Sequence, residues 1–145
     1  MNKAPGSPQL TDTRTRSWGW PIALMILLAV ASTIFAWRAV LAATAQFVAG
    51  DVGGAVTTLL AAIAWVLGTA GLIHNGRKMR RIAWVSWSLN VLGSLIGVVA
   101  PAAFSAVNPW QMAGKEYFFL PAIGTIFALG WLAWSDPARV AARGN

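Results

Sequence analysis

The chain has 145 residues, of which 57% are hydrophobic and 10% are charged, and a mean hydropathy of +0.61. A soluble domain carries about 25% charged residues, so this chain has too little polar surface for a water-exposed fold and is expected to lie in a membrane. Its net charge of +7 comes from cations placed in short segments between apolar runs, a pattern of membrane topology, and we expect no nucleic-acid partner.

Residues 1–17 are polar and rich in Pro, Gly, Ser and Thr, and they are expected to form a cytoplasmic tail. The first apolar run covers residues 20–47. Trp18, Trp20 and Trp37 are expected to be interfacial anchors, and Arg38 is expected at the headgroup level, where its side chain can contact lipid phosphate. Ala29-Val30-Ala31 also resembles a signal-peptide cleavage site, an alternative that the long polar leader disfavours.

Two further apolar runs, at residues 54–74 and 82–104, flank a basic segment. Short loops rich in Lys and Arg stay on the cytoplasmic side. The segment is therefore expected to be an inner hairpin loop that fixes topology and contacts lipid headgroups through Arg77, Lys78, Arg80 and Arg81. The lone histidine, His74, is expected to cap the end of the helix before this loop.

The fourth run covers residues 117–134 and is followed by a basic tail at 136–145. Asn108-Pro109 predicts a short interfacial turn before it. Trp110 and Trp134 are expected to be further interfacial anchors. The four spans lie within residues 18–135 and predict an all-α, integral membrane four-helix bundle of up-down-up-down topology in the cytoplasmic membrane, with both termini cytoplasmic.

One face of the run at 82–104 is small or polar at spacings of three and four residues. Ser86, Asn90, Gly93 and Gly97 lie on this stripe, and the two glycines form a GxxxG that lets two backbones approach closely. Asn90 is about 13 Å inside the run and needs a hydrogen-bond partner there. Gly68 and Gly71 in the preceding run are expected to complete a helix-packing surface, because the short loop pairs the two runs in an antiparallel hairpin.

The segments "RRIAWVSWSLNVLGSLIG" (80–97) and "YFFLPAIGTIFALGWLAW" (117–134) resemble small four-span membrane proteins of high-GC Gram-positive, actinobacterial bacteria, a family without established function. The resemblance covers the third and fourth spans. It implies a fold and a cell type, and it carries no site residue over to this chain.

The apolar runs contain no carboxylate, and the sequence has no Ser–His–Asp set or phosphate-binding loop. We therefore expect neither an enzyme nor a cofactor or metal site. The sequence favours a non-catalytic accessory or scaffolding subunit of a larger membrane complex, with membrane lipid and other integral subunits as partners. Two alternatives stay open: a small dimeric permease or exporter, as a homodimer, and a lipid- or quinone-associated membrane protein.

Overall fold

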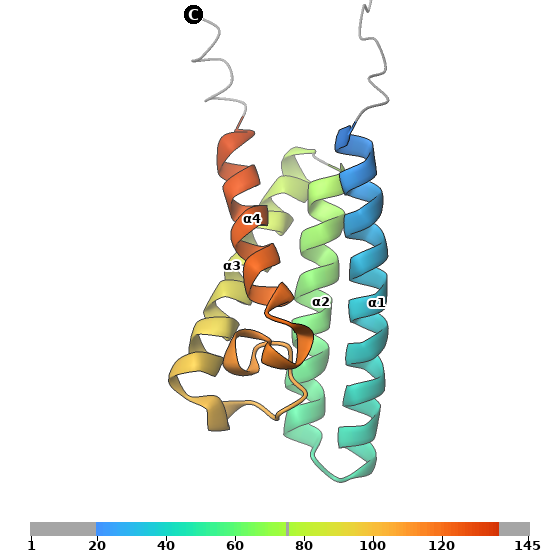
Figure 1. Ribbon diagram of the computed structural model, residues 1–145, viewed down its shortest axis with the longest axis vertical. Coiled ribbons are helices and arrows are strands. Elements are labelled where there is room, and N and C mark those ends of the chain that lie inside the picture. The colour runs from blue at the N-terminus through green and yellow to red at the C-terminus, as the bar shows by residue number, and fades with distance from the viewer. Residues whose placement is uncertain (1–19, 75, 137–145) are drawn as a thin grey trace, which may run out of the picture.

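The computed structural model describes residues 20–74 and 76–136, and every regular element in them is helical. These residues form four α-helices (Figure 1). Three short 3-10 turns lie in the connection between the third and the fourth helix. The elements are α1 (Trp20–Val48), α2 (Val52–His74), α3 (Arg77–Val99), η1 (Pro101–Ala103), η2 (Gln111–Ala113), η3 (Lys115–Tyr117) and α4 (Leu120–Trp134). The expected all-α fold is confirmed for this part of the chain.

Three of these helices are long and apolar enough to cross a membrane. They are α1 from Ile22 onward, α2 and α3, with mean hydropathies of 2.1, 2.0 and 1.7. A fourth span exists only if Gln111–Tyr117 and α4, which meet at 110°, are counted as one. The 15 residues of α4 extend about 22 Å, less than the hydrocarbon thickness of about 30 Å. The described residues thus offer three or four spans of a multi-pass membrane protein.

The helices pack in the order of the chain. α1 lies along α2, α2 along α3, and α4 along α3, whereas α1 and α4 are not an extensively packed pair. Figure 1 shows the start of α1, the α2–α3 turn and the end of α4 at one end of the molecule, and the α1–α2 turn at the other. We call the first end the basic end, because it contains Arg77 to Arg81. The bundle therefore stays open between α1 and α4.

The bounds of α3 and α4 differ from the apolar runs. α3 begins at Arg77 rather than at residue 82, because Arg and Lys are good helix formers and prolong the helix through the basic segment. It ends at Val99 rather than at 104, because Pro101 disfavours helical geometry at Ala100 (φ −130°, ψ 74°). The basic segment is therefore the start of a helix, and the loop before it is shorter than expected.

α4 begins at Leu120 rather than at residue 117. Phe118 and Phe119 adopt φ values of 56° and 59°, so the backbone cannot continue as a right-handed helix from η3 into α4. The loop between α3 and α4, residues 100–119, folds back against α3 as a result (Figure 1).

The interior of the protein is small and polar, and its exterior is large and apolar. Ala39, Ala61, Ala83 and Thr58 are completely buried, while long aliphatic and aromatic side chains cover the outside of all four helices. Lipid removes the hydrophobic drive between helices, so packing of small residues and internal hydrogen bonds hold such a fold together. This distribution is the one expected of a chain surrounded by lipid.

Candidate functional site

The later part of the small-residue stripe of α3, from Asn90 to Gly97, is covered by the α3–α4 loop. Asn90, Gly93 and Gly97 are buried on this stripe, as is Ser86. A Cβ atom at Gly93 would lie 2.6 Å from Cε2 of Trp110, and one at Gly97 would meet the Trp110 carbonyl oxygen. Both glycines therefore let another segment approach closely, as expected, but that segment is the loop backbone and its indole rather than a second helix.

Trp110 is buried, with 6% of its surface exposed. Its indole Nε1–H donates to Oδ1 of Asn90 at 2.9 Å, and Asn90 Nδ2 donates to the carbonyl oxygen of Ser86 at 3.0 Å. The expectation of an interfacial anchor at Trp110 is therefore wrong, because the glycine notch of α3 accepts the ring inside the protein. The amide of Asn90 has the interior partner that its depth required.

Asn108 holds the loop in this position. Its Oδ1 accepts the backbone N–H of Trp110 at 2.8 Å, and its Nδ2 donates to Oγ1 of Thr57 on α2 at 3.2 Å. Asn108 is 1% exposed, so the expected interfacial turn at Asn108-Pro109 is buried instead. Non-helical backbone is tolerated at membrane depth only where protein or a water-filled cavity surrounds it. The bonds of Asn108 hold this loop against the protein.

A second set of bonds ties the same loop to the α1–α2 hairpin. Gln46 Nε2 donates to Oγ of Ser105, and Thr58 Oγ1 donates to Oε1 of Gln46 at 3.0 Å. We call the residues of these bonds the loop cluster: Gln46, Thr57, Thr58, Asn90, Ser105, Asn108 and Trp110. Three α-helices thus hold the loop. Of these residues, the sequence predicted an interior hydrogen bond only for Asn90, because nothing in the local pattern pairs Gln46 with Ser105 across 59 residues.

Aromatic rings form a ladder through the centre of the bundle. The ring centroid of Trp65 lies 4.8 Å from that of Phe35 and 4.9 Å from that of Trp87. The ring centroids of Phe35 and Tyr117 are 5.2 Å apart. This aromatic ladder connects α1, α2, α3 and η3.

Hydroxyl groups complete the polar side of the ladder. The indole Nε1–H of Trp65 donates to Oγ of Ser32 at 2.9 Å, and the hydroxyls of Ser32 and Thr69 are hydrogen-bonded at 2.8 Å. In the described part of the chain, Trp87 Nε1 and Ser94 Oγ are buried polar atoms without a hydrogen-bond partner.

The glycines of α2 lie against α3, as the sequence indicated. A Cβ atom at Gly68 would lie 2.7 Å from Cε2 of Trp87. One at Gly71 would lie 2.6 Å from the Met79 carbonyl oxygen and 2.7 Å from Cβ of Ala83. Both positions have no room for a side chain, so they set the close approach of the two helices.

The basic segment divides into two parts. Arg77, Lys78 and Arg81 are exposed. Arg80 is half-buried: Nη1 donates to Ser135 Oγ at 3.2 Å and Nη2 to the Leu132 carbonyl oxygen. A cation that binds the last carbonyls of a helix stabilises its negative end. Arg80 therefore caps α4, whereas the sequence predicted that it would contact lipid headgroups.

The remaining charged candidates lie on the surface. Arg38 is exposed, with Cζ 5.1 Å above the ring of Tyr117, a cation–π contact that links α1 to η3. His74 is exposed at the last residue of α2. Asp51 Oδ1 accepts the Gly54 N–H at 2.8 Å and so caps α2. Within residues 20–74 and 76–136, no three His, Cys, Asp or Glu side chains are grouped as metal ligands.

The other expected anchors have different outcomes. Trp37 and Trp134 are on the surface, 65% and 58% exposed. Trp18 lies outside the described residues, and Trp20 is the first residue of α1. An interfacial role for these tryptophans stays a prediction.

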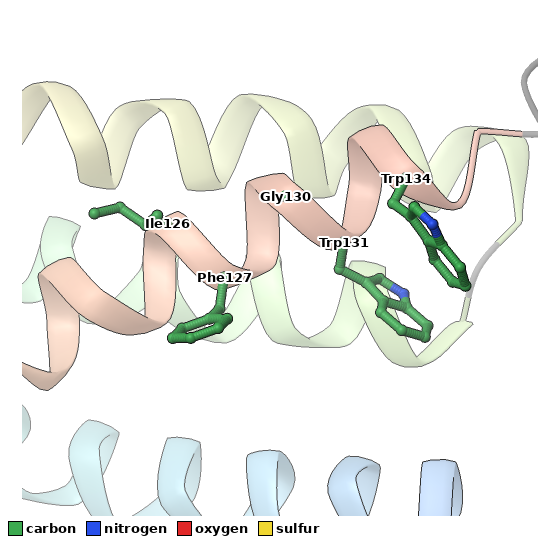
Figure 2. A pocket seen from close by; sticks show the side chains of 5 residues that line it. All are labelled: Ile126, Phe127, Gly130, Trp131 and Trp134. Atoms are coloured by element: carbon green, nitrogen blue, oxygen red, sulfur yellow. The ribbon is translucent and has the colours of Figure 1, made fainter.

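Two hollows lie beside α4. A groove of about 430 Å³ runs between α1, α2 and α4 and is lined by apolar residues. A shallower depression on α4 itself is lined by Ile126, Phe127, Gly130, Trp131 and Trp134 (Figure 2). Figure 2 shows the rings of Phe127 and Trp131 on the side of α4 that points toward α1, and Ile126 directed elsewhere.

Compared with known proteins, the chain matches no family model, no curated protein and no solved structure. The resemblance to small actinobacterial four-span proteins therefore stays a prediction.

Proposed function

We propose that the chain is a cytoplasmic-membrane protein of four spans with both termini in the cytoplasm. The fourth span is the bent pair formed by Gln111–Tyr117 and α4. The exposed cations at the basic end support this orientation. Arg77, Lys78 and Arg81 are exposed there, at the end where α1 begins and α4 ends. Cations in short loops favour the cytoplasmic side.

We further propose that the protein is a non-catalytic accessory or scaffolding subunit of a larger membrane complex. The observation that carries this proposal is how the interior polar groups are used. Apart from Trp87 Nε1 and Ser94 Oγ, the buried polar side-chain atoms in the described part of the chain bond to other groups of the protein. The loop cluster and the Ser32–Thr69–Trp65 bonds join α1, α2, α3 and the α3–α4 loop. Such bonding gives a rigid body whose remaining surface serves contacts with lipid and with other helices.

The partner surface that we propose is the depression on α4, and its occupant is a transmembrane helix of another polypeptide. The glycines of the α3 stripe are already covered by the loop, so they no longer serve this purpose. Gly130 is exposed on α4, and a Cβ atom there would meet nothing within 4 Å. A small residue between large apolar side chains is the arrangement that lets two membrane helices approach closely.

A crosslinking experiment tests this proposal. The chain has no cysteine, so Gly130→Cys and Ile126→Cys provide unique attachment points, and Ile34→Cys on the exposed face of α1 is the matched control. We expect crosslinks to a different polypeptide in native membranes from the two α4 positions and none from position 34. We also expect a complex of defined mass that Gly130→Leu breaks up and Ile34→Leu leaves intact.

A chain that purifies as a solitary monomer from mild detergent, without crosslinks from α4, would refute the accessory role. Crosslinks of the chain to itself would instead point to a homodimer. A dimeric permease stays a prediction, and its test is flux in proteoliposomes that depends on Asn90.

A further inference from the structure

The groove between α1, α2 and α4 is open because of how the helices pack. α4 packs along α3, and α1 packs along α2. The two outer helices, α1 and α4, therefore leave a gap over α2. Met25 and Leu28 line it from α1, Leu72 from α2, and Phe127 and Trp131 from α4. The groove is apolar along this length, so it accepts an apolar occupant.

The aromatic ladder lies next to the inner end of the groove. Gly124 lines the groove, and a Cβ atom there would lie 2.8 Å from Cη2 of Trp65. Trp65 also contacts Phe35 on α1, so its ring bridges the outer helices at this depth. From Gly124 to Trp131 the groove is about 10 Å long, at 1.5 Å per residue. It is therefore a short groove that ends inside the bilayer.

Its size distinguishes between two apolar occupants. A helix about 10 Å across would need roughly 800 Å³ over the same length. The groove has about 430 Å³. A partner helix would therefore lie mostly outside the groove, whereas an alkyl chain, with its much smaller cross-section, fits inside it.

The cations at the basic end of the molecule indicate which polar group the occupant carries. Arg77 follows the groove residue Ile73 by four positions, and Arg80 binds the carbonyl oxygen of Leu132, next to the groove residue Trp131. The first residues of α3 include three exposed cations, Arg77, Lys78 and Arg81. The one carboxylate described at this end is Asp136. An occupant with an anionic headgroup above its alkyl chain is complementary to this end of the groove.

We propose that the groove binds one acyl chain of an anionic phospholipid, whose phosphate lies against Arg77, Lys78 and Arg81. This site goes beyond the accessory role and does not depend on it. Phe127 and Trp131 line both hollows, but Met25 and Leu28 on α1 line only the groove, and Ile126 and Gly130 line only the proposed partner surface. Variants can therefore test the two sites separately.

The test uses the full chain in detergent and native mass spectrometry with palmitoyl-oleoyl phosphatidylglycerol, against phosphatidylcholine of the same acyl chains. We expect one phosphatidylglycerol per chain, bound at least about fivefold more tightly than phosphatidylcholine. Lys78→Gln and Arg81→Gln are each expected to weaken phosphatidylglycerol binding about fivefold. Lys115→Gln, which removes a cation from η3, is the matched control and is expected to change nothing.

The groove itself is tested by filling it. Met25→Trp is expected to weaken phosphatidylglycerol binding about tenfold, because displacing only two methylene groups has an effect of that size. Ile26→Trp places the same ring one residue further along α1, at a position that does not line the groove, and is expected to bind like the unmodified chain. Leu28→Phe is a second, smaller filler in case Met25→Trp lowers the thermal stability.

Equal affinities for the two lipids would overturn the anionic headgroup. Equal binding by the Met25, Leu28 and Ile26 variants would overturn the groove as the site, because the lipid would then be bound only at the general lipid-facing surface.

Discussion

The indole N–H of Trp110 donates to the side-chain carbonyl of Asn90 at 2.9 Å, between a loop and the middle of α3. Both groups are buried, so neither has water as an alternative partner. Trp110→Phe keeps a ring on Gly93 but leaves the Asn90 oxygen unpaired. We expect the free energy of unfolding to fall by about 1–2 kcal/mol.

A double-mutant cycle isolates this bond. Trp110→Phe, Asn90→Leu and the double variant are unfolded reversibly in mixed micelles, and a coupling energy of about 0.6–2 kcal/mol is expected. Additive effects of the two substitutions would show that the contact contributes nothing of its own.

The second prediction concerns the glycine notch. Gly97→Ala places a methyl group against the backbone carbonyl of Trp110, which cannot move without displacing the loop. We expect a loss of about 1–3 kcal/mol in the same unfolding assay, the usual cost of overpacking. Gly53→Ala in α2 is the matched control, because a Cβ atom there meets nothing within 4 Å. That substitution is expected to be neutral or slightly stabilising, since Ala favours a helix over Gly.

How far the sequence predicted this arrangement can be judged from α3. The periodicity of Ser86, Asn90, Gly93 and Gly97 identified the face that is buried, because helical spacing is a local property. It did not identify what covers that face. The loop folds back because Phe118 and Phe119 adopt positive φ, and nothing in their residue type favours that conformation. The occupant of a face depends on such distant turns.

The ends of α3 show the same limit. Hydropathy placed the start of the span after the cations, because a charged residue is unfavourable in lipid. Helix formation has no such requirement, so α3 continues back to Arg77 and brings Arg80 to the carbonyl end of α4. The long apolar helices were therefore readable from hydropathy, whereas the cap that Arg80 provides is a tertiary contact.

The third prediction tests this cap. Arg80→Gln removes a charge that bonds the Leu132 carbonyl and Ser135, so the last turn of α4 should fray. We expect amide hydrogen exchange in that turn to become about tenfold faster, since bonds to charged groups contribute about 1.5–3 kcal/mol. Lys78→Gln removes an exposed cation from the same turn of α3 and should leave exchange in α4 unchanged. Equal protection in both variants would show that Arg80 does not hold α4.

The fourth prediction concerns Ser32, whose hydroxyl serves both Trp65 and Thr69. Ser32→Ala leaves the indole N–H of Trp65 unpaired next to Phe35, and we expect a loss of about 1–2 kcal/mol in the free energy of unfolding. Thr33→Ser is a poor comparison because it keeps the hydroxyl, so the control is Thr33→Ala. The Thr33 hydroxyl bonds the carbonyl of Ala29 on its own exposed turn, and its removal should change stability by less than about 0.5 kcal/mol.

The last prediction fixes the orientation in the membrane. Lys78 lies at the basic end, and Ala49 lies in the α1–α2 turn at the opposite end (Figure 1). Because the chain has no cysteine, Lys78→Cys and Ala49→Cys each provide a single thiol. Three exposed cations favour the cytoplasmic side for the basic end, at about 1 kcal/mol for each cation near anionic lipid. An impermeant maleimide added to intact cells should therefore label position 49 and reach position 78 only after the membrane is opened. Labelling of position 78 in intact cells would reverse the proposed orientation, and with it the leaflet from which the groove between α1 and α4 receives its lipid.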